Sequence, residues 1–359
     1  LLHVAKLIDE ADHAAEWGVT FGPPEIDLDR LRSFEQGVVG KLTGGLGQLA
    51  KRRKIRFLRA RARFSSPTAL ALDPIGDGDV PSRLEFGAAI LATGSRPTRI
   101  PGFPVSPRVM DSTAALALPD VPKRLLVVGG GYIGLELGMM YAKLGSQVTV
   151  LEATDGLLPG QEKDCIKVLA RSAKKMGIKV HTETFAKGYE RKGSKLEVTI
   201  ETKGKKSTFE CDQILSTVGR RPYSEGLGLE NVGLAPTKQG FLEVDSQMRT
   251  KVPNIYAVGD IAGQPMLAHK GSKEGLVAAA VIAGQAEEYD ARCVPAVIFT
   301  SPEMASVGLT EEQCKEQGLE TKSGKFPFAA SGRAMSLMET EGFVKIVSDA
   351  KTDEVLGVH

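Results

Sequence analysis

A glycine-rich turn near the middle of the chain has the residue types and the spacing for binding a dinucleotide. Gly129, Gly131 and Gly134 form a G-x-G-x-x-G pattern directly after the apolar run at residues 125–128. The first glycine permits a tight turn, the second lets backbone approach a pyrophosphate, and the third allows a helix to pack closely on a strand. Glu152 follows roughly twenty residues later, where its carboxylate can accept hydrogen bonds from both hydroxyls of an adenosine ribose.

The same carboxylate favours NAD over its 2′-phosphorylated form. A 2′-phosphate would place negative charge against Glu152, and residues 153–155 supply no arginine to receive it. A helix is predicted at residues 135–144, and its first amides and positive dipole end would hold the phosphates. Because strand, turn, helix, second strand and terminal acid occur in this order, the sequence predicts an NAD site rather than a glycine-rich turn without a ligand.

Two further segments place small or acidic residues at the ends of predicted strands. Asp260 follows the strand at residues 255–258, and a carboxylate there can accept hydrogen bonds from a sugar hydroxyl beside a phosphate. Residues 89–97 predict a buried strand that ends in the turn Thr93-Gly94, which suits backbone lying against a flat ligand. Alone, Asp260 is typical of an acid at the approach to a helix. Beside the NAD pattern, we interpret both segments as ligand-binding.

The elements needed to position these residues follow from the periodicity of the chain, which predicts an α/β protein ending in antiparallel strands. Helices are expected at residues 1–17, 29–53, 135–144, 162–176, 268–284 and 310–317. Strands are expected at residues 55–64, 69–72, 84–92, 125–128, 147–151, 179–184, 196–202, 207–211, 213–218, 255–258, 296–300, 304–307, 321–327, 342–347 and 355–358.

The composition is that of an ordinary globular protein, with two or three domains expected over 359 residues. The net charge of +2 gives no reason to expect nucleic acid or an anionic membrane as a partner. Four cysteines without C-x-x-C or metal-type spacing predict reduced thiols in a cytoplasmic protein. The chain opens within a predicted helix and closes within a predicted strand, so we expect an internal piece of a longer protein.

The motifs resemble those of the two-dinucleotide flavoprotein disulfide reductases and, among these, of the dihydrolipoamide dehydrogenases, from end to end of the chain. The segments that carry the resemblance are LTGGL at 42–46, ATGSRP at 92–97, residues 129–136, GRRP at 219–222, VGD at 258–260, PMLAHK at 265–270 and KFPFA at 325–329. The resemblance implies an α/β fold with two Rossmann-like dinucleotide-binding domains of three-layer ββα character, followed by an α+β dimerisation domain.

It also implies domain boundaries and a quaternary structure. Residues 1–121 and 252–291 would belong to the FAD-binding part, residues 122–251 would bind NAD, and residues 292–359 would form the interface domain of a homodimer. These boundaries are expectations from the family.

The resemblance further implies which residues hold the two cofactors. FAD would be held by Ala62, Thr93, Gly94, Ser95, Asp260, Met266, Leu267, Ala268 and His269. NAD would be held by Gly129, Gly131, Tyr132, Ile133, Gly134, Glu136, Glu152, Ala186 and Gly219. Within these sets, Asp260 would bind the pyrophosphate–ribityl region and Glu136 would lie where nicotinamide meets flavin. Ala62, which stands where the family usually has glycine, would lie near the adenine.

The catalytic groups of the family have no counterpart among these residues. The first FAD fingerprint and two redox-active cysteines would precede Leu1, and a proton-shuttling His–Glu pair would follow His359. In the family, dihydrolipoamide on the lipoyl domains of 2-oxo acid dehydrogenase complexes reduces the disulfide, and electrons pass through FAD to NAD⁺. We therefore expect these 359 residues alone to leave dihydrolipoamide unoxidised.

Two alternatives stay open at this point. One is another member of the family, such as a mercuric or glutathione reductase or a soluble transhydrogenase; glutathione reductases prefer NADPH, and Glu152 followed by Ala153-Thr154 argues against that preference. The other is a binding or assembly module without catalysis, which stable folding without retained flavin would favour.

Overall fold

The computed structural model describes residues 1–359, which divide into two compact units. Unit 1 contains Leu1–Gln36, Pro97–Gly219 and Pro295–His359, and unit 2 contains Gly37–Arg96 and Arg220–Val294. Each unit is therefore built from segments that lie far apart in the sequence. Helix α2, Leu28–Arg52, contributes residues to both. None of the helices combines the length and the apolar character needed to cross a bilayer.

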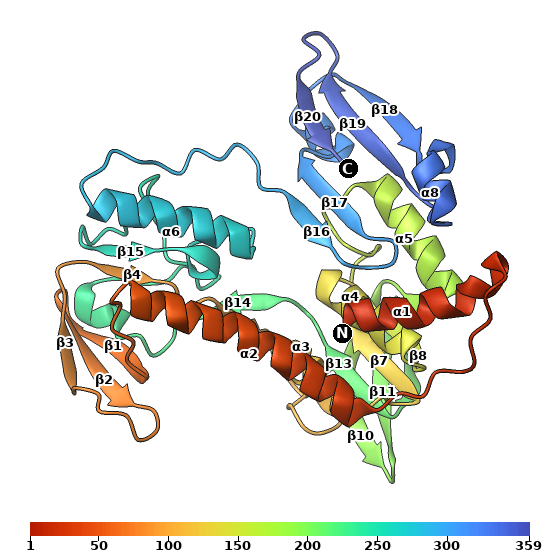
Figure 1. Ribbon diagram of the computed structural model, residues 1–359, viewed down its shortest axis with the longest axis horizontal. Helices are drawn as coiled ribbons and strands as arrows, with labels where there is room; N and C mark the ends of the chain where they lie inside the picture. Colours follow the sequence, from red (N-terminus) through yellow and green to blue (C-terminus); the bar gives the residue numbers. More distant parts are fainter. The chain divides into compact units, whose positions relative to one another are not determined.

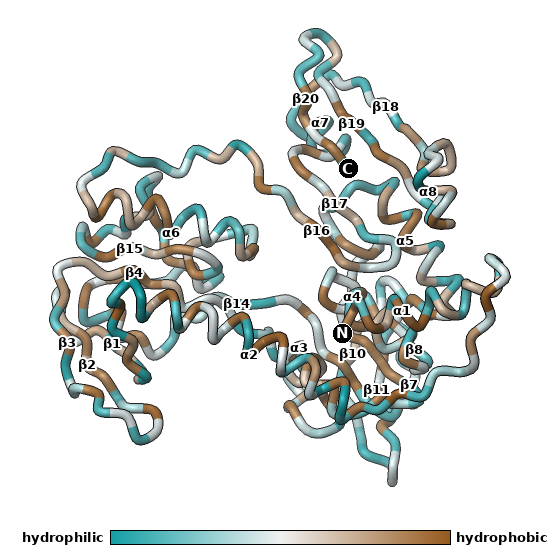
Figure 2. The backbone as a smooth tube through the Cα atoms, in the orientation of Figure 1, coloured by the Kyte–Doolittle hydropathy of each residue, from teal (hydrophilic) through white to brown (hydrophobic).

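A parallel five-stranded sheet forms the centre of unit 1, with the strand order β6-β13-β7-β8-β9. Figure 1 labels three of its strands, β7, β8 and β13. Its strands are β6 (Val109–Asp111), β7 (Arg124–Val128), β8 (Gln147–Leu151), β9 (Lys179–His181) and β13 (Gln213–Ser216). The central strands β7 and β8, largely brown in Figure 2, have the apolar character that a sheet covered on both faces requires.

Alternate residues of β7 serve two different layers. Leu125 and Val127 belong to the core formed with the helices α1 and α4, whereas Leu126 and Val128 pack against an antiparallel sheet. The helical elements here are α1 (Leu2–His13), η1 (Ala14–Trp17), α3 (Ser112–Leu116), α4 (Tyr132–Lys143) and α5 (Lys163–Lys175). The antiparallel strands are β10 (Thr184–Lys192), β11 (Lys195–Thr202) and β12 (Lys205–Cys211). The expected three-layer ββα arrangement is confirmed.

The C-terminal part of unit 1 is an antiparallel module with the strand order β16-β17-β20-β19-β18. Its strands are β16 (Ala296–Ile298), β17 (Met304–Gly308), β18 (Thr321–Pro327), β19 (Phe343–Asp349) and β20 (Val355–Val358). Its helices are α7 (Glu311–Glu316), η4 (Phe328–Ala330) and α8 (Gly332–Ser336). Thr310 starts α7 with a complete capping box, so this short helix has a well-defined beginning.

Unit 2 combines a small antiparallel sheet with a parallel strand pair, one complete long helix and the C-terminal part of α2. The sheet contains β1 (Ala60–Ser66), β2 (Ala69–Pro74) and β3 (Arg83–Glu85). The parallel pair is β4 (Ala89–Leu91) with β15 (Ile255–Ala257), which leads through η3 (Gly259–Ile261) to α6 (Ala268–Ile282). The remaining elements are η2 (Leu229–Val232), β5 (Ser95–Pro97) and β14 (Arg220–Pro222).

Two strand predictions are wrong in instructive ways. The single strand predicted at residues 84–92 is divided between β3 and β4, which belong to different sheets, and Ile90 is 40% exposed rather than buried. The strand predicted at residues 179–184 ends early because Glu183 adopts a positive φ of 51°, after which β10 begins a separate sheet. Residues 184–192 contain too few apolar side chains at alternate positions for periodicity to predict β10.

Candidate dinucleotide-binding sites

The turn between β7 and α4 uses two of its glycines for the fold itself. Gly129 has a φ of +111°, and a Cβ atom there would lie 2.5 Å from the carbonyl oxygen of Thr217. A Cβ atom on Gly134 would lie 2.1 Å from the carbonyl oxygen of Gly129 and 2.6 Å from Oγ1 of Thr217. Neither position can hold a larger residue without moving backbone. The predicted roles of these glycines, tight turn and close helix–strand packing, agree with this geometry.

Gly131 differs, because nothing in the fold requires a glycine at this position. Its backbone is in the ordinary extended region, with φ −75° and ψ 179°, and no neighbouring heavy atom lies within 4 Å of a Cβ built there. No side chain caps the first turn of α4 at this position. The space beside Gly131 is thus open, and it adjoins the N-terminus of a helix, where anionic groups bind favourably.

The carboxylate of Glu152 lies beneath this turn and is 7% exposed. Its Oε2 accepts a hydrogen bond from the amide of Gly130 at 2.7 Å. Its Oε1 accepts from the amide and the hydroxyl of Thr154, each at 2.8 Å. A carboxylate offers about four lone-pair positions, so Glu152 organises the turn and keeps capacity for about one further donor.

Glu136 connects helix α4 to the C-terminal module. Its Oε1 accepts a hydrogen bond from the amide of Phe299 at 2.8 Å, and the amide of Ser301 lies 3.3 Å from the sulfur of Met139. Burial raises the pKa of Glu136 above its ordinary value, and the Phe299 amide offsets part of this rise. The acid is therefore held at a half-buried position where α4 meets the strands after residue 295.

The remaining predicted NAD residues are Tyr132, Ile133, Gly219 and Ala186, and they occupy different elements of unit 1. Tyr132 and Ile133 open α4, and Tyr132 is 41% exposed. Gly219 follows β13 with a φ of +102°, and its carbonyl accepts a hydrogen bond from the amide of Thr98 at 3.0 Å. Ala186 lies on β10, where it packs against the apolar layer beneath the parallel sheet, and no hydrogen bond joins it to the turn.

In unit 2, the predicted flavin residues Ser95 and Asp260 are hydrogen bonded to each other. The hydroxyl of Ser95 donates to Oδ2 of Asp260. Arg220 donates from Nε to the Ser95 hydroxyl at 2.7 Å and from its terminal nitrogen to the Ser95 carbonyl at 2.8 Å. Sequence reasoning missed Arg220 as a site residue, although it belongs to the GRRP motif at residues 219–222.

The neighbouring segment at Thr93 and Gly94 is tied to residue 223. The hydroxyl of Thr93 donates to the carbonyl of Tyr223 at 2.7 Å, and the amide of Tyr223 donates to the carbonyl of Gly94 at 2.9 Å. Gly94 has a φ of +69° and open space at its Cβ position. The small-residue turn predicted from the sequence therefore has a fixed backbone with one unobstructed face.

A buried ion pair supports the turn that carries Asp260. The amide of Gly259 donates to Oε2 of Glu274 at 2.7 Å, and Nζ of Lys270 lies 2.8 Å from Oε1 of the same carboxylate. The side chains of Lys270 and Glu274 are only 6% and 5% exposed. Sequence reasoning missed both residues, although their i, i+4 spacing on a predicted helix was a usable signal.

The other predicted flavin residues are placed at the start of α6 and on β1. Leu267 precedes α6 without a side-chain cap, Met266 and Leu267 are half-buried, and Ala268 and His269 are exposed. Ala62 is exposed on β1, opposite Leu72 of β2. The structure places Ala62 in a different sheet from Ser95, and Asp260 lies in η3.

Comparison with known proteins assigns the chain to a family. Residues 3–275 match the pyridine nucleotide-disulphide oxidoreductase family, and residues 294–359 match its dimerisation domain. Dihydrolipoyl dehydrogenase from Bacillus subtilis is 44% identical over 99% of this chain and 76% of the relative. Dihydrolipoyl dehydrogenase from Haemophilus influenzae is 45% identical over 99% of this chain and 74% of the relative.

Solved structures agree with this assignment. LpdA from Mycobacterium tuberculosis has a TM-score of 0.89 at 28% identity, covering 99% of this chain and 78% of that one. The HOCl-induced flavoprotein disulfide reductase RclA from Escherichia coli has a TM-score of 0.85 at 26% identity, covering 100% of this chain and 79% of that one. The expected α/β fold is confirmed. The chain belongs to the pyridine nucleotide-disulphide oxidoreductases and, within them, to the dihydrolipoyl dehydrogenases, enzymes that use FAD and NAD.

Proposed function

We propose that this chain provides the NAD-binding part and much of the FAD-binding part of an enzyme that oxidises dihydrolipoamide on the lipoyl domains of 2-oxo acid dehydrogenase complexes. The observation that carries the proposal is the 44% identity to a dihydrolipoyl dehydrogenase over 99% of this chain, and the open space at Gly131 supports its NAD-binding part. Bound FAD would supply the two-electron transfer to NAD⁺, while the protein residues bind, orient and shield the reactants.

On the nucleotide side, the first turn of α4 would hold the pyrophosphate. Backbone at Gly131, Tyr132 and Ile133 borders the open space, and the helix dipole favours the negative charge of the phosphates. The remaining lone-pair capacity of Glu152 would accept one ribose hydroxyl, and its charge would repel a 2′-phosphate. Gly129 and Gly134 serve this site by keeping the turn and the helix in contact.

On the flavin side, Asp260 and Ser95 would bind the pyrophosphate–ribityl region. Arg220 holds Ser95 through two hydrogen bonds, so the Ser95 hydroxyl has a fixed direction. The guanidinium also brings positive charge close to the proposed pyrophosphate position. The residues at the start of α6, Met266 to His269, would face the flavin, and the N-cap residue Leu267 provides no side-chain cap for this helix.

The assembly and the compartment are also proposals. We propose a homodimer, supported by the match of residues 294–359 to a dimerisation domain. A cytoplasmic location is supported by four cysteines that are all free. Burial raises the pKa of Cys165 to about 11 and that of Cys211 to about 12, so these two thiols are poor nucleophiles.

The test is a parallel titration of the protein with NADH and NADPH, followed by nicotinamide fluorescence. The expected result is saturable binding of NADH and at least about tenfold weaker binding of NADPH, since a 2′-phosphate meets the Glu152 charge. Equal binding, or a preference for NADPH, would contradict the proposed nucleotide. Oxidation of dihydrolipoamide with NAD⁺ by the natural full-length protein then tests the substrate.

A further inference from the structure

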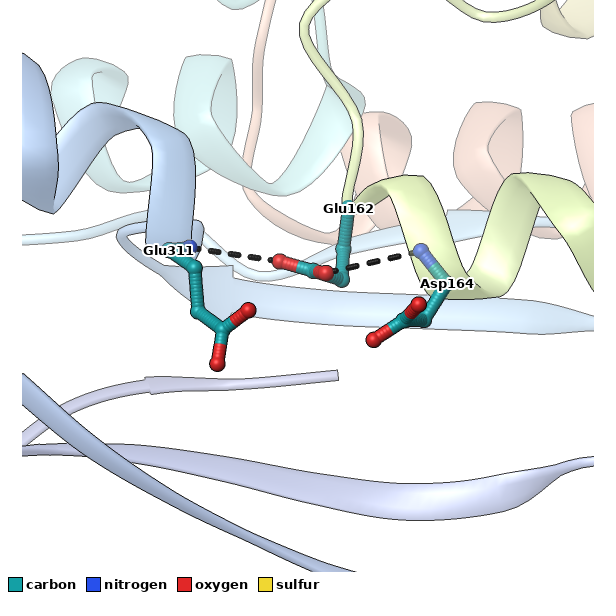
Figure 3. Close-up of side chains that lie close together, drawn as sticks. All are labelled: Glu162, Asp164 and Glu311. Carbon is teal, nitrogen blue, oxygen red and sulfur yellow. Dashed lines mark hydrogen bonds between the residues drawn. The ribbon is translucent and has the colours of Figure 1, made fainter.

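A fully buried lysine in the C-terminal module binds three carboxylates. Nζ of Lys345 lies 2.7 Å from Glu162, 3.0 Å from Asp164 and 2.7 Å from Glu311, and its side chain is 0% exposed. Figure 3 shows these carboxylates converging from the start of α5 and the start of α7. The arrangement is that of a cation site, with the ammonium group of Lys345 as the cation.

The cluster links the N-terminus of α5 to the C-terminal module, and Glu162 is the most buried of its three acids. Glu162 is 4% exposed; it accepts the amide of Asp164 as the cap of α5 and the amide of Glu311 at 3.2 Å. Lys325 donates to Asp164 as well. The lysines hold the pKa of Asp164 well below its usual range, and Lys345 lowers the pKa of Glu311. Asp164 and Glu311 are thus charged and paired at neutral pH.

Glu162 is also one end of the loop that begins at Glu152. Within this loop, Leu157 and Leu158 are 5% and 3% exposed, and the amide of Leu158 donates to the carbonyl of Gly130 at 3.1 Å. A Cβ atom on Gly130 would lie 2.6 Å from the side chain of Leu157, so the loop packs directly on the glycine turn. Leu158 adopts a φ of +50°, a conformation that surrounding contacts must maintain.

We infer that Lys345 is a positioning residue for nucleotide binding. By holding Glu162, it fixes the loop at residues 153–161 against Gly130 and thereby sets the shape of the turn beside Gly131. A residue of the C-terminal module thus tunes the affinity for NAD without touching it. The inference rests on the proposed NAD site and adds a role for a region in which the sequence showed no chemistry.

The test compares three variants by NADH titration at a temperature where circular dichroism shows all of them folded. Lys345→Met removes the central cation, and Glu162→Gln keeps the capping oxygen but removes its charge. Lys163→Met is the matched control, because it breaks the ion pair of Lys163 with Glu312 between the same two helices. The side chains of Lys163 and Glu312 are 65% and 51% exposed.

We expect Lys345→Met to raise the NADH dissociation constant about 3- to 30-fold, the range of long-range coupling effects. Glu162→Gln should raise it by a smaller factor, and Lys163→Met should leave it within about twofold. If Lys345→Met does not fold, Glu162→Gln decides. Unchanged NADH affinity in a folded Lys345→Met or Glu162→Gln variant overturns the inference alone, whereas a parent protein that does not bind NADH overturns the proposed function as well.

Discussion

Two strand–turn–helix segments in this chain have the same plan and differ in how they use it. In unit 1, β7 leads through Gly129 into α4; in unit 2, β15 leads through Gly259 into α6. Each helix carries a glycine that faces the turn, Gly134 and Gly271. Each turn also donates one amide to a buried glutamate at 2.7 Å. Because both segments have the helix glycine and the amide–glutamate hydrogen bond, these two features stabilise the strand–turn–helix fold in both units.

The glutamates differ in their counter-charges. Glu274 is paired with Lys270, whereas Glu152 makes no ion pair and is held by amide and hydroxyl donors alone. A paired carboxylate is committed to the fold, while an unpaired one still attracts donors. The comparison therefore separates a supporting acid, Glu274, from an acid available to a ligand, Glu152. In unit 2 we propose that the adjacent Asp260 takes the ligand role.

The largest expected effect comes from breaking the ion pair of unit 2. Lys270→Met leaves the Glu274 charge buried without a cation, which should lower the free energy of unfolding by about 3–5 kcal/mol. Lys273→Met, which breaks the half-exposed pair with Glu287, should cost about 1 kcal/mol or less. Urea denaturation of both variants measures the difference. Equal losses would mean that Glu274 is not the supporting acid.

A smaller effect should separate the two helix glycines. Gly134→Ala places a methyl group 2.1 Å from a backbone oxygen, whereas Gly271→Ala places one 3.1 Å from the Cα of Gly259. Overpacking should therefore cost about 3 kcal/mol at Gly134 and about 1 kcal/mol at Gly271. Thermal unfolding of the two variants checks the order, and a Gly271 variant that is the less stable would reverse the ranking of the two turns.

The smallest effect concerns Glu136, the half-buried acid on α4. Because the pKa of Glu136 is raised in the folded state, the native protein binds more protons than the unfolded chain above the ordinary value of 4.5. Stability from this group is therefore lost as pH rises through that window. Glu136→Gln should gain stability relative to the parent between pH 4 and pH 7, by about 1 kcal/mol or less. A constant difference across this pH range would contradict the sign.

The glycine turn of unit 1 was predictable because its parts are consecutive. Residues 124–152 contain the strand, the glycines, the helix and the acid, and β8 lies where the periodicity places it. The lone-pair capacity left at Glu152 was not predictable, because it depends on the conformation of Thr154 and Gly130. Periodicity identifies elements, whereas hydrogen-bond saturation depends on coordinates.

The contacts of Arg220 in unit 2 and the Lys345 cluster could not be predicted from the sequence, because their residues lie far apart in the chain. Arg220 and Ser95 are 125 residues apart, and Lys345 and Glu162 are 183 residues apart. No local pattern marks such pairs, and a buried lysine in the strand 343–349 is indistinguishable by type from an exposed one. The split of the predicted strand 84–92 has the same origin, since β3 pairs with the neighbouring β2 whereas β4 pairs with β15 from a distant part of the chain.

The most direct test of the central claim is an NADH titration of Gly131→Ala. Alanine fits the local backbone and meets no neighbour within 4 Å, so stability should change by about 1 kcal/mol or less. Its methyl group enters the space assigned to the pyrophosphate, and the NADH dissociation constant should rise about tenfold or more. Gly275→Ala, an equally open helix position in unit 2, is the control and should bind NADH normally. If Gly131→Ala binds NADH as tightly as the parent protein, the open glycine is not the nucleotide site.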